Sequence, residues 1–303
     1  MKQFAYLAIC VVLFFACSKK QHNFSEIERI NVNSSNKVNF TDLFDEWHLI
    51  FPETNDASLF GLYIQRIELF EDRIYVLNMK QSGRNLLCFD TNGHFVFNVD
   101  RMGQGPREYT YFGDFFIDTK NRVIVMLCEN NKWMYLDLDG NYIYEKTIQE
   151  IDPPIRYSCE FNDDLYVSYR DCEHGNDDDI VFWDRESLQI KRTAKTINSS
   201  SSLAFLAPIL PIFNYKNDFF YCDGSDTIYD ISSNIGSSIP KYFIDFGKKQ
   251  RNFKNNFLPK DNNEKAQLIR SAFTNNEIIP VHSLLFNGQY FLLHIWKMTR
   301  KIN

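Results

Sequence analysis

A repeated order of turn, strand and hairpin constrains the fold of this chain more than any other feature. The segment 71–109 shows the unit: a polar turn, the apolar run Ile74–Asn78, and two further runs, Leu86–Asp90 and His94–Val99, joined by Asp90-Thr91-Asn92-Gly93. Asn-Gly supplies the positive φ angles of tight hairpin turns, so the last two runs are predicted to pair antiparallel. One such sheet cannot bury both of its faces alone, so recurrence of the unit decides the architecture.

The unit does recur. Its second strands begin near four positions that are 49, 42 and 54 residues apart: Ile74, Val123, Leu165 and Phe219. A period of about 40–50 residues with four short strands is typical of a β-propeller blade. A two-sheet sandwich, the alternative, would not repeat the same order four times. The sequence therefore predicts an all-β propeller of four-stranded blades over residues 36–303.

About four and a half blades are present. The complete blades are predicted at about 62–99, 115–148, 157–193 and 209–246, and half a blade at 282–296. A polar insertion at 247–276 precedes the half blade, and within it Asn263–Phe273 is predicted to form a short amphipathic helix. The run Trp47–Phe51 is predicted to be a strand that closes the ring by joining the last blade.

The N-terminus predicts export and an anchor. A positively charged start precedes an apolar run, Phe4–Ala16, of signal-peptide length and too short for a comfortable membrane span. The run ends at Ala16-Cys17, which resembles a bacterial lipobox, although Phe14 stands where that pattern prefers Leu. We expect residues 1–17 to be a lipoprotein signal peptide, with Cys17 lipidated in the bilayer, and 18–35 to be a tether. A plain secretory signal is the alternative, and the side of the membrane that the domain faces is left open.

Charge and cysteine content exclude several classes of function. The net charge is −6 and no basic stripe is present, which argues against nucleic acid as a partner. Beyond Cys17, five cysteines lie about one per repeat, mostly inside apolar runs, at positions 88, 128, 159, 172 and 222. Their odd number and wide spacing favour free buried thiols over a disulfide framework. The absence of Cys-x-x-Cys argues against a zinc or redox site.

Four stretches carry a family resemblance: Leu43–Leu59, Asp72–Val76, Gly103–Tyr109 and Tyr242–Gly247. Their pattern, above all the Gly-x-Gly-Pro-x-Glu-Tyr corner, resembles the six-bladed β-propeller lipoproteins of Gram-negative bacteria, relatives in architecture of NHL-repeat propellers. The resemblance covers roughly residues 36–296. It implies six blades, so we expect the chain to be truncated at its C-terminus, and an open ring would expose an apolar blade face.

The Gly103–Pro106 corner is not a phosphate loop, because no helix and no Lys-Ser/Thr follow it. We expect it to carry the crossover between blades, with Tyr109 packed between them. Arg107 and Glu108 are ligand-binding candidates if the corner lies near the mouth of the channel.

Metal binding has one candidate cluster. Asp177-Asp178-Asp179 offers hard oxygen ligands for Ca²⁺, and a solvated loop is the alternative. Asp137–Asn141 is predicted to be a hairpin turn rather than a calcium loop. Propellers that resemble gluconolactonase place acidic and Asn ligands around a central metal. The sequence leaves open whether first-strand residues such as Glu68, Asp114 and Glu160 converge in that way.

Four tryptophans are candidates for stacking on sugar rings: Trp47, Trp133, Trp183 and Trp296. Trp133 and Trp183 are the two that we name as ligand-binding candidates, and packing between blades is the alternative for all four. No Gly-x-Ser-x-Gly elbow and no His-Glu-x-x-His motif is present.

Three hypotheses about function follow. The first is a membrane-anchored binding module of the cell envelope, without a cofactor, for an unknown protein or glycan. The second is a Ca²⁺-dependent hydrolase or lyase of the lactonase type, and the third is a non-functional remnant of a longer gene. The lipobox, the repeats and the absence of a catalytic motif favour the first.

Overall fold

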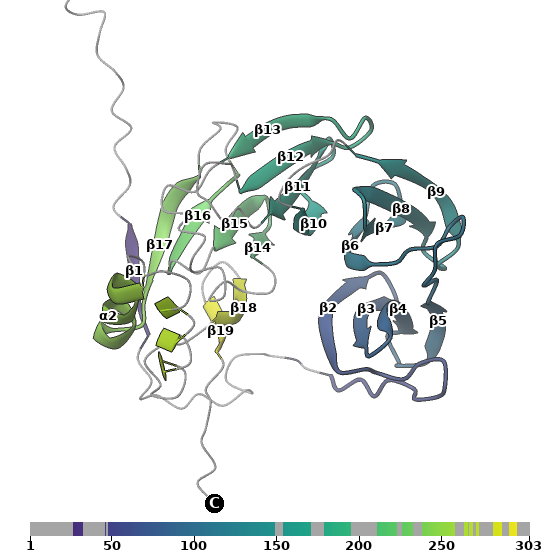
Figure 1. Cartoon of the computed structure of the whole chain (residues 1–303), viewed down its shortest axis with the longest axis horizontal. Coiled ribbons are helices and arrows are strands. Elements are labelled where there is room, and N and C mark those ends of the chain that lie inside the picture. Colours follow the sequence, from purple (N-terminus) through teal and green to yellow (C-terminus); the bar gives the residue numbers. More distant parts are fainter. Residues whose placement is uncertain are drawn as a thin grey trace, which may run out of the picture.

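Four blades, three of them four-stranded sheets and one a five-stranded sheet, stand side by side around a common centre (Figure 1). The computed structural model describes residues 27–32, 46, 48–148, 154–170, 179–194, 211–222, 226–232 and 238–257, short helical pieces between 264 and 272, and the strands at 281–286 and 291–295. Each blade contains an antiparallel meander of four strands in which neighbours in sequence are neighbours in space. The predicted all-β propeller with four-stranded blades is confirmed.

The blades have these strands. Blade one contains β2 (Tyr63–Phe70), β3 (Arg73–Lys80), β4 (Gly83–Asp90) and β5 (Phe95–Val99). Blade two contains β6 (Phe112–Asp118), β7 (Val123–Cys128), β8 (Lys132–Asp137) and β9 (Tyr142–Thr147). Blade three contains β10 (Ile155–Glu160), β11 (Leu165–Arg170), β12 (Ile180–Asp184) and β13 (Ile190–Ala194). Blade four contains β14 (Ile212–Tyr215), β15 (Asp218–Cys222), β16 (Thr227–Asp230) and β17 (Ile239–Asp245).

A hairpin and an added strand complete the described sheets. β18 (Val281–Phe286) and β19 (Phe291–Ile295) pair antiparallel, and β18 lies beside β14 (Figure 1). β1 (Glu28–Asn31) pairs in parallel with β17, the outermost strand of blade four, and makes that sheet five-stranded. β1 lies inside the segment that the sequence assigned to a tether.

The predicted closing strand at Trp47–Phe51 is wrong for its described part, residues 48–51, which form no strand. The outer edge of β17 is already occupied by β1. The segment after residue 48 instead lies against the β4–β5 turn, where the N–H of Glu53 donates to the carbonyl of Gly93 at 2.7 Å. Trp47 itself lies outside the described residues.

Two hairpin turns take the predicted place with a different conformation from the one expected. Gly93 and Gly140 have φ angles of 93° and 80°, and each donates its N–H to an Asp carbonyl three residues earlier. Asn92 is not among the residues with positive φ, so one glycine supplies the left-handed position in the first turn. The aspartates Asp90 and Asp137 each accept two backbone N–H groups inside their own turns. These contacts identify Asp137–Asn141 as a hairpin turn, as predicted.

One helix was not predicted. α2 (Lys248–Phe257) follows β17 and is rich in Lys and Asn, so local periodicity signals it poorly. Among its residues with described side chains, two are buried: Phe253, and Gln250, whose amide donates to Asp226 at 2.9 Å. Of the predicted helix at 263–273, the described residues 264–265, 267–268 and 271–272 are helical. No helix in the described part of the chain combines the length and the apolar character needed to cross a membrane.

The core lies between the blades. Buried apolar clusters join blade one to two, two to three, and three to four. The described cysteines are free thiols, as expected, and Cys88 and Cys222 are buried; Cys172 lies outside the described residues. On the face of blade one opposite the cluster that it shares with blade two, β2 and the residue before it present a row of exposed apolar side chains: Leu62, Ile64, Ile67 and Leu69. Within the described residues, this face of blade one is uncovered.

Candidate functional site

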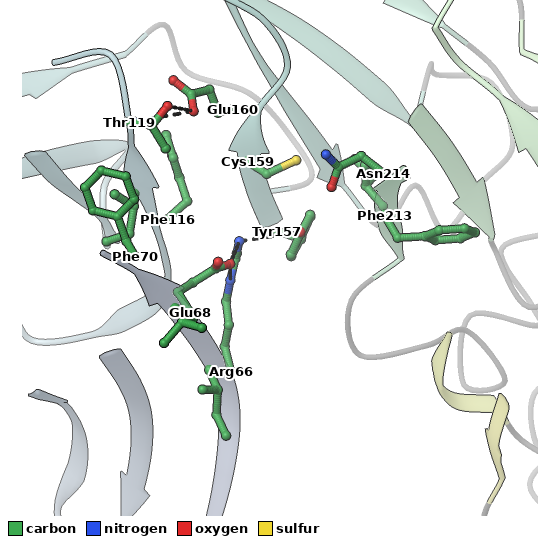
Figure 2. A pocket seen from close by; sticks show the side chains of 14 residues that line it. Arg66, Glu68, Phe70, Phe116, Thr119, Tyr157, Cys159, Glu160, Phe213 and Asn214 are labelled. Carbon is green, nitrogen blue, oxygen red and sulfur yellow. Dashed lines mark hydrogen bonds and ion pairs between the residues drawn. The ribbon is translucent and has the colours of Figure 1, made fainter. Parts of the chain in front are cut away.

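The first strands of the four blades line a cavity of about 410 Å³ at the centre of the fold (Figure 2). A volume of this size suits a small molecule. Its lining comes from β2, β6, β10 and β14, together with Thr119 in the turn after β6. The polar members of the lining are Arg66, Glu68, Thr119, Tyr157, Cys159, Glu160 and Asn214.

Three of these first strands are bulged at the same place. The pairing register of β2, β6 and β10 shifts at one extra residue: Gln65, Gly113 and Arg156, respectively. The residues that follow are Arg66, Asp114 and Tyr157. Because a bulge bends its strand and redirects the neighbouring side chains, the three bulges aim these residues at one another.

Arg66 is the meeting point of blades one, two and three. Its guanidinium donates to Glu68 at 2.7 Å, to Asp114 at 2.7 Å and to the carbonyl of Ser158 at 2.9 Å. A second contact with Glu68 at 2.6 Å and a longer one with the Tyr157 hydroxyl at 3.4 Å use the remaining N–H groups. All five donors of this buried side chain therefore have acceptors.

Arg185, just after β12, makes a second cluster of the same kind. It pairs with Asp118, the last residue of β6, and with Glu160, the last residue of β10, at 2.7 Å for Glu160. Asp118 also accepts a hydrogen bond from the Tyr166 hydroxyl, and Glu160 accepts one from Thr119 at 2.6 Å. Arg185 and Asp118 are buried.

The two clusters share one plan, which we call the two carboxylate–arginine–carboxylate triads. Each holds a buried aspartate on β6, a buried arginine, and a glutamate that reaches the cavity. The glutamate side chains are 32% exposed for Glu68 and 21% for Glu160. With ionised carboxylates, each triad carries one net negative charge. Glu68, Asp114 and Glu160 thus do not converge on one point; two arginines divide them between two triads.

Burial controls the titration of the groups around Arg66. It raises the pKa of the Asp114 carboxyl to about 6, against the opposing effect of the Arg66 charge. It likewise raises the pKa of the Cys159 thiol to about 12 and that of the Tyr157 phenol well above its usual range. A thiol with that pKa stays protonated at neutral pH, so Cys159 lines the cavity as a weakly polar group and not as a nucleophile.

The two tryptophans proposed to bind ligand lie in the core. Trp133 is 1% exposed and Trp183 is 0% exposed. Their rings pack edge-to-face at 6.0 Å, and the Trp183 indole donates to the Ser168 hydroxyl at 2.8 Å. Buried rings cannot stack on a sugar, so the structure assigns both to packing between blades two and three.

Arg107 and Glu108 lie away from the central cavity. The Arg107 guanidinium sits 5.1 Å from the ring centre of Tyr142, in the outermost strand β9. The Glu108 carboxylate accepts a hydrogen bond from the N–H of Gly105 at 2.7 Å, inside its own turn. The expectation for Tyr109 is confirmed: it is fully buried between the first two blades, and its hydroxyl lies 3.2 Å from the carbonyls of Arg84 and Val99.

The acidic cluster is only partly described. Asp177 and Asp178 lie outside the described residues. Asp179 is buried, and its main-chain carbonyl accepts the N–H of Arg170 at 3.0 Å. Within the described ranges no three His, Cys, Asp or Glu side chains are grouped as a metal site would need. Calcium binding at 177–179 stays a prediction.

Sequence reasoning missed both arginines. Arg66 stands in the run Tyr-Ile-Gln-Arg-Ile-Glu-Leu-Phe, where a charge among apolar residues of an innermost strand was the available signal. Arg185 gave no such signal, because it lies in a polar turn between β12 and β13. Only the fold brings it to Asp118, 67 residues away in sequence.

Comparisons with known proteins give a family and a fold. A family model described as "Domain of unknown function (DUF4934)" matches residues 26–303. No curated protein matches the sequence. Among solved structures, the chain is similar to a "putative exported protein" from Bacteroides fragilis NCTC 9343, with a TM-score of 0.67 and 18% identity over 90% of this chain and 75% of that one.

Two further structures are WD40 propellers. The WD40 β-propeller domain of Doa1 gives a TM-score of 0.39 and 13% identity over 57% of this chain and 50% of that chain. The WD40 repeats of RRP9 give 0.42 and 8% over 63% and 52%. The likeness to the Bacteroides protein, at 18% identity, shows a shared fold alone.

Proposed function

Since the chain belongs to the DUF4934 family, a domain of unknown function, we propose from its own architecture that it is an exported binding module whose central cavity holds a small ligand. In this proposal Cys17 is lipidated and fixes the module to the membrane of the cell envelope. Membership of the six-bladed lipoprotein propellers is part of the same proposal. The description of the Bacteroides protein as exported agrees with this address.

One observation carries the proposal: both triads hold the walls of the cavity in fixed positions. The Arg66 triad joins β2, β6 and β10, and the Arg185 triad joins β6, β10 and the turn after β12. A cavity whose polar walls are already held by hydrogen bonds loses little conformational entropy when a ligand enters. This is the property of a preformed binding site.

The same contacts favour binding over a metal-dependent lactonase. A calcium site needs several oxygens free to face one ion. Glu68 and Asp114 are instead bonded to Arg66, and Glu160 to Arg185, so neither triad presents the several free oxygens that a calcium ion needs. The thiol of Cys159 is protonated at neutral pH, and the hydroxyls of Ser158 and Ser168 are bonded to each other at 2.6 Å.

The test is whether the protein retains a small molecule in this cavity. The full-length protein is purified from its native membrane, and native mass spectrometry compares it with Asn214→Trp, which places a large ring on a lining residue. Asn92→Trp, in the β4–β5 turn, is the matched control. We expect an adduct of small mass on the wild type and the control and its loss from Asn214→Trp. An adduct carried equally by all three proteins, or by none, would contradict a ligand in the cavity.

A further inference from the structure

Apart from the Asn214 amide and the Tyr157 hydroxyl, the lining of the central cavity offers a ligand hydrogen-bond acceptors and not donors. The five N–H groups of Arg66 already have acceptors, and the hydroxyl of Thr119 donates to Glu160. Of the two carboxylates that reach the cavity, Glu68 uses one oxygen, Oε1, for both contacts with Arg66. Its Oε2 has no hydrogen-bond partner among the described residues.

The net charge of the groups around the cavity is negative. Each triad has two carboxylates and one arginine, and the partly exposed member is a glutamate in both. Among the described residues of the lining there is no lysine, and the one arginine is 1% exposed at the side chain. From these residues an anion would meet two net negative charges and no available cationic donor. A cation would meet an unpaired carboxylate oxygen.

Much of the remaining wall is apolar. Ile67 and Leu69 line the cavity, but they alternate along β2 with Glu68 and so project from the opposite face of the strand. Phe70 lies two residues after Glu68, projects from the same face as Glu68, and is half-buried in the lining (Figure 2). A ligand with a charged end at Glu68 would thus lay its hydrocarbon part against the ring of Phe70.

We propose that the central cavity binds an aliphatic ammonium compound, with its cationic nitrogen at Glu68 and its hydrocarbon part on Phe70. This inference rests on the proposed function and narrows it to one class of ligand. A protonated amine is a donor without an acceptor, which complements an acceptor-rich lining. Charge-assisted hydrogen bonds to carboxylate are also about twice as strong as neutral ones.

Three probes of one length test the class of ligand. They are 1,5-diaminopentane, 1,5-pentanediol and glutarate, which share a five-carbon span and differ in the charge of their ends. Isothermal titration calorimetry measures each against the full-length protein in a non-ionic detergent at neutral pH. We expect binding of the diamine alone, and a weaker affinity at high salt because screening reduces the attraction.

Variants locate the contact. Glu68→Gln and Glu160→Gln each remove a charge and keep an acceptor oxygen, and each should weaken diamine binding about tenfold or more. Glu145→Gln, on the exposed outer strand β9, is the matched control and should bind as the wild type does. Diamine binding that is indifferent to both cavity variants would overturn the proposal, as would the absence of diamine binding to a folded wild type.

The outcomes separate this inference from the proposed function. If the diol or glutarate binds more tightly than the diamine, and Asn214→Trp abolishes that binding, the cavity is a ligand site and the ammonium class is wrong. If native mass spectrometry finds no cavity-dependent adduct while the diamine binds through Glu68, the ammonium class stands and a ligand retained from the cell is ruled out. Failure of both experiments would refute both proposals.

Discussion

The guanidinium of Arg66 on the first strand of blade one donates a 2.7 Å hydrogen bond to the carboxylate of Asp114 on the first strand of blade two, and both side chains are at most 3% exposed. Two charges so deeply buried depend on each other, because either one alone would be an uncompensated charge in the core. We expect Arg66→Met to lower the free energy of unfolding by about 3–5 kcal/mol.

A double-mutant cycle measures the coupling between the two. Adding Asp114→Asn to Arg66→Met removes the stranded carboxylate, so the double variant should be less destabilised than the sum of the single variants by about 1–3 kcal/mol. Urea unfolding gives the four free energies. Arg122→Met breaks the exposed pair with Glu71 and should have little effect. Additive single effects would show that Arg66 and Asp114 do not support each other.

Asp114 should also make stability depend on pH. Burial raises the pKa of its carboxyl from the ordinary 3.8 to about 6 in the folded protein. Between these values the folded state binds more protons at this group than the unfolded state does. Its stabilising contribution is therefore complete below about pH 4 and is lost as the pH rises through 6. Relative to Asp114→Asn, the wild type should lose stability from pH 4.5 to 7.5. A difference between the two proteins that is constant over this interval would contradict the raised pKa.

The strand β1 should contribute measurable stability through its backbone. The N–H of Val32 donates to the carbonyl of Asp245 at 3.1 Å, and in a paired strand every second N–H points the same way, so that of Ile30 also faces β17. Ile30→Pro removes that donor and should lower Tm by about 2–4 °C. Asn31→Pro, whose N–H faces away from β17, should change Tm less. Equal effects would mean that β1 is held by its side chains alone.

The hydroxyl of Tyr109 should stabilise the joint between blades one and two. It lies within hydrogen-bond distance of two main-chain carbonyls, those of Arg84 and Val99, and Tyr109→Phe leaves both without this partner in the core. We expect a loss of about 1–3 kcal/mol in the free energy of unfolding. Tyr144→Phe is the control, since that ring is 40% exposed and its hydroxyl makes no hydrogen bond with the described residues. A loss as large in the control would show that removing a hydroxyl costs as much where it has no such partners, so the contacts at the joint would not explain the effect.

The proposed anchor has a direct test. Cys17→Ser removes the only thiol that the lipobox-like sequence can present for lipidation, so the protein should move from the membrane fraction to the soluble one. A radiolabelled fatty acid should be incorporated into the wild type and not into the variant. Label in the variant, or an unchanged membrane fraction, would rule out Cys17 as the anchor.

Much of the fold could be predicted from local sequence. β7 and β11 begin at the predicted residues, Val123 and Leu165, because each apolar run follows a polar turn. Gly93 and Gly140 marked two hairpin turns, because the left-handed φ angles of these turns favour glycine. α2 was missed because its burial depends on Phe253 and Gln250, and the latter contacts Asp226 of the turn before β16.

The sequence by itself determined the repeat, the alternation of strands and turns, and an all-β architecture, since each depends on residues that are close in the chain. Only the tertiary structure decided which side chains share a site. Arg66 and Ser158 are 92 residues apart, and three bulges in separate strands bring their blades together. The same packing buries Trp133 and Trp183 and divides the acidic residues between two arginines. Burial and ion pairing depend on contacts between blades, and no local pattern specifies which faces of two distant sheets will meet.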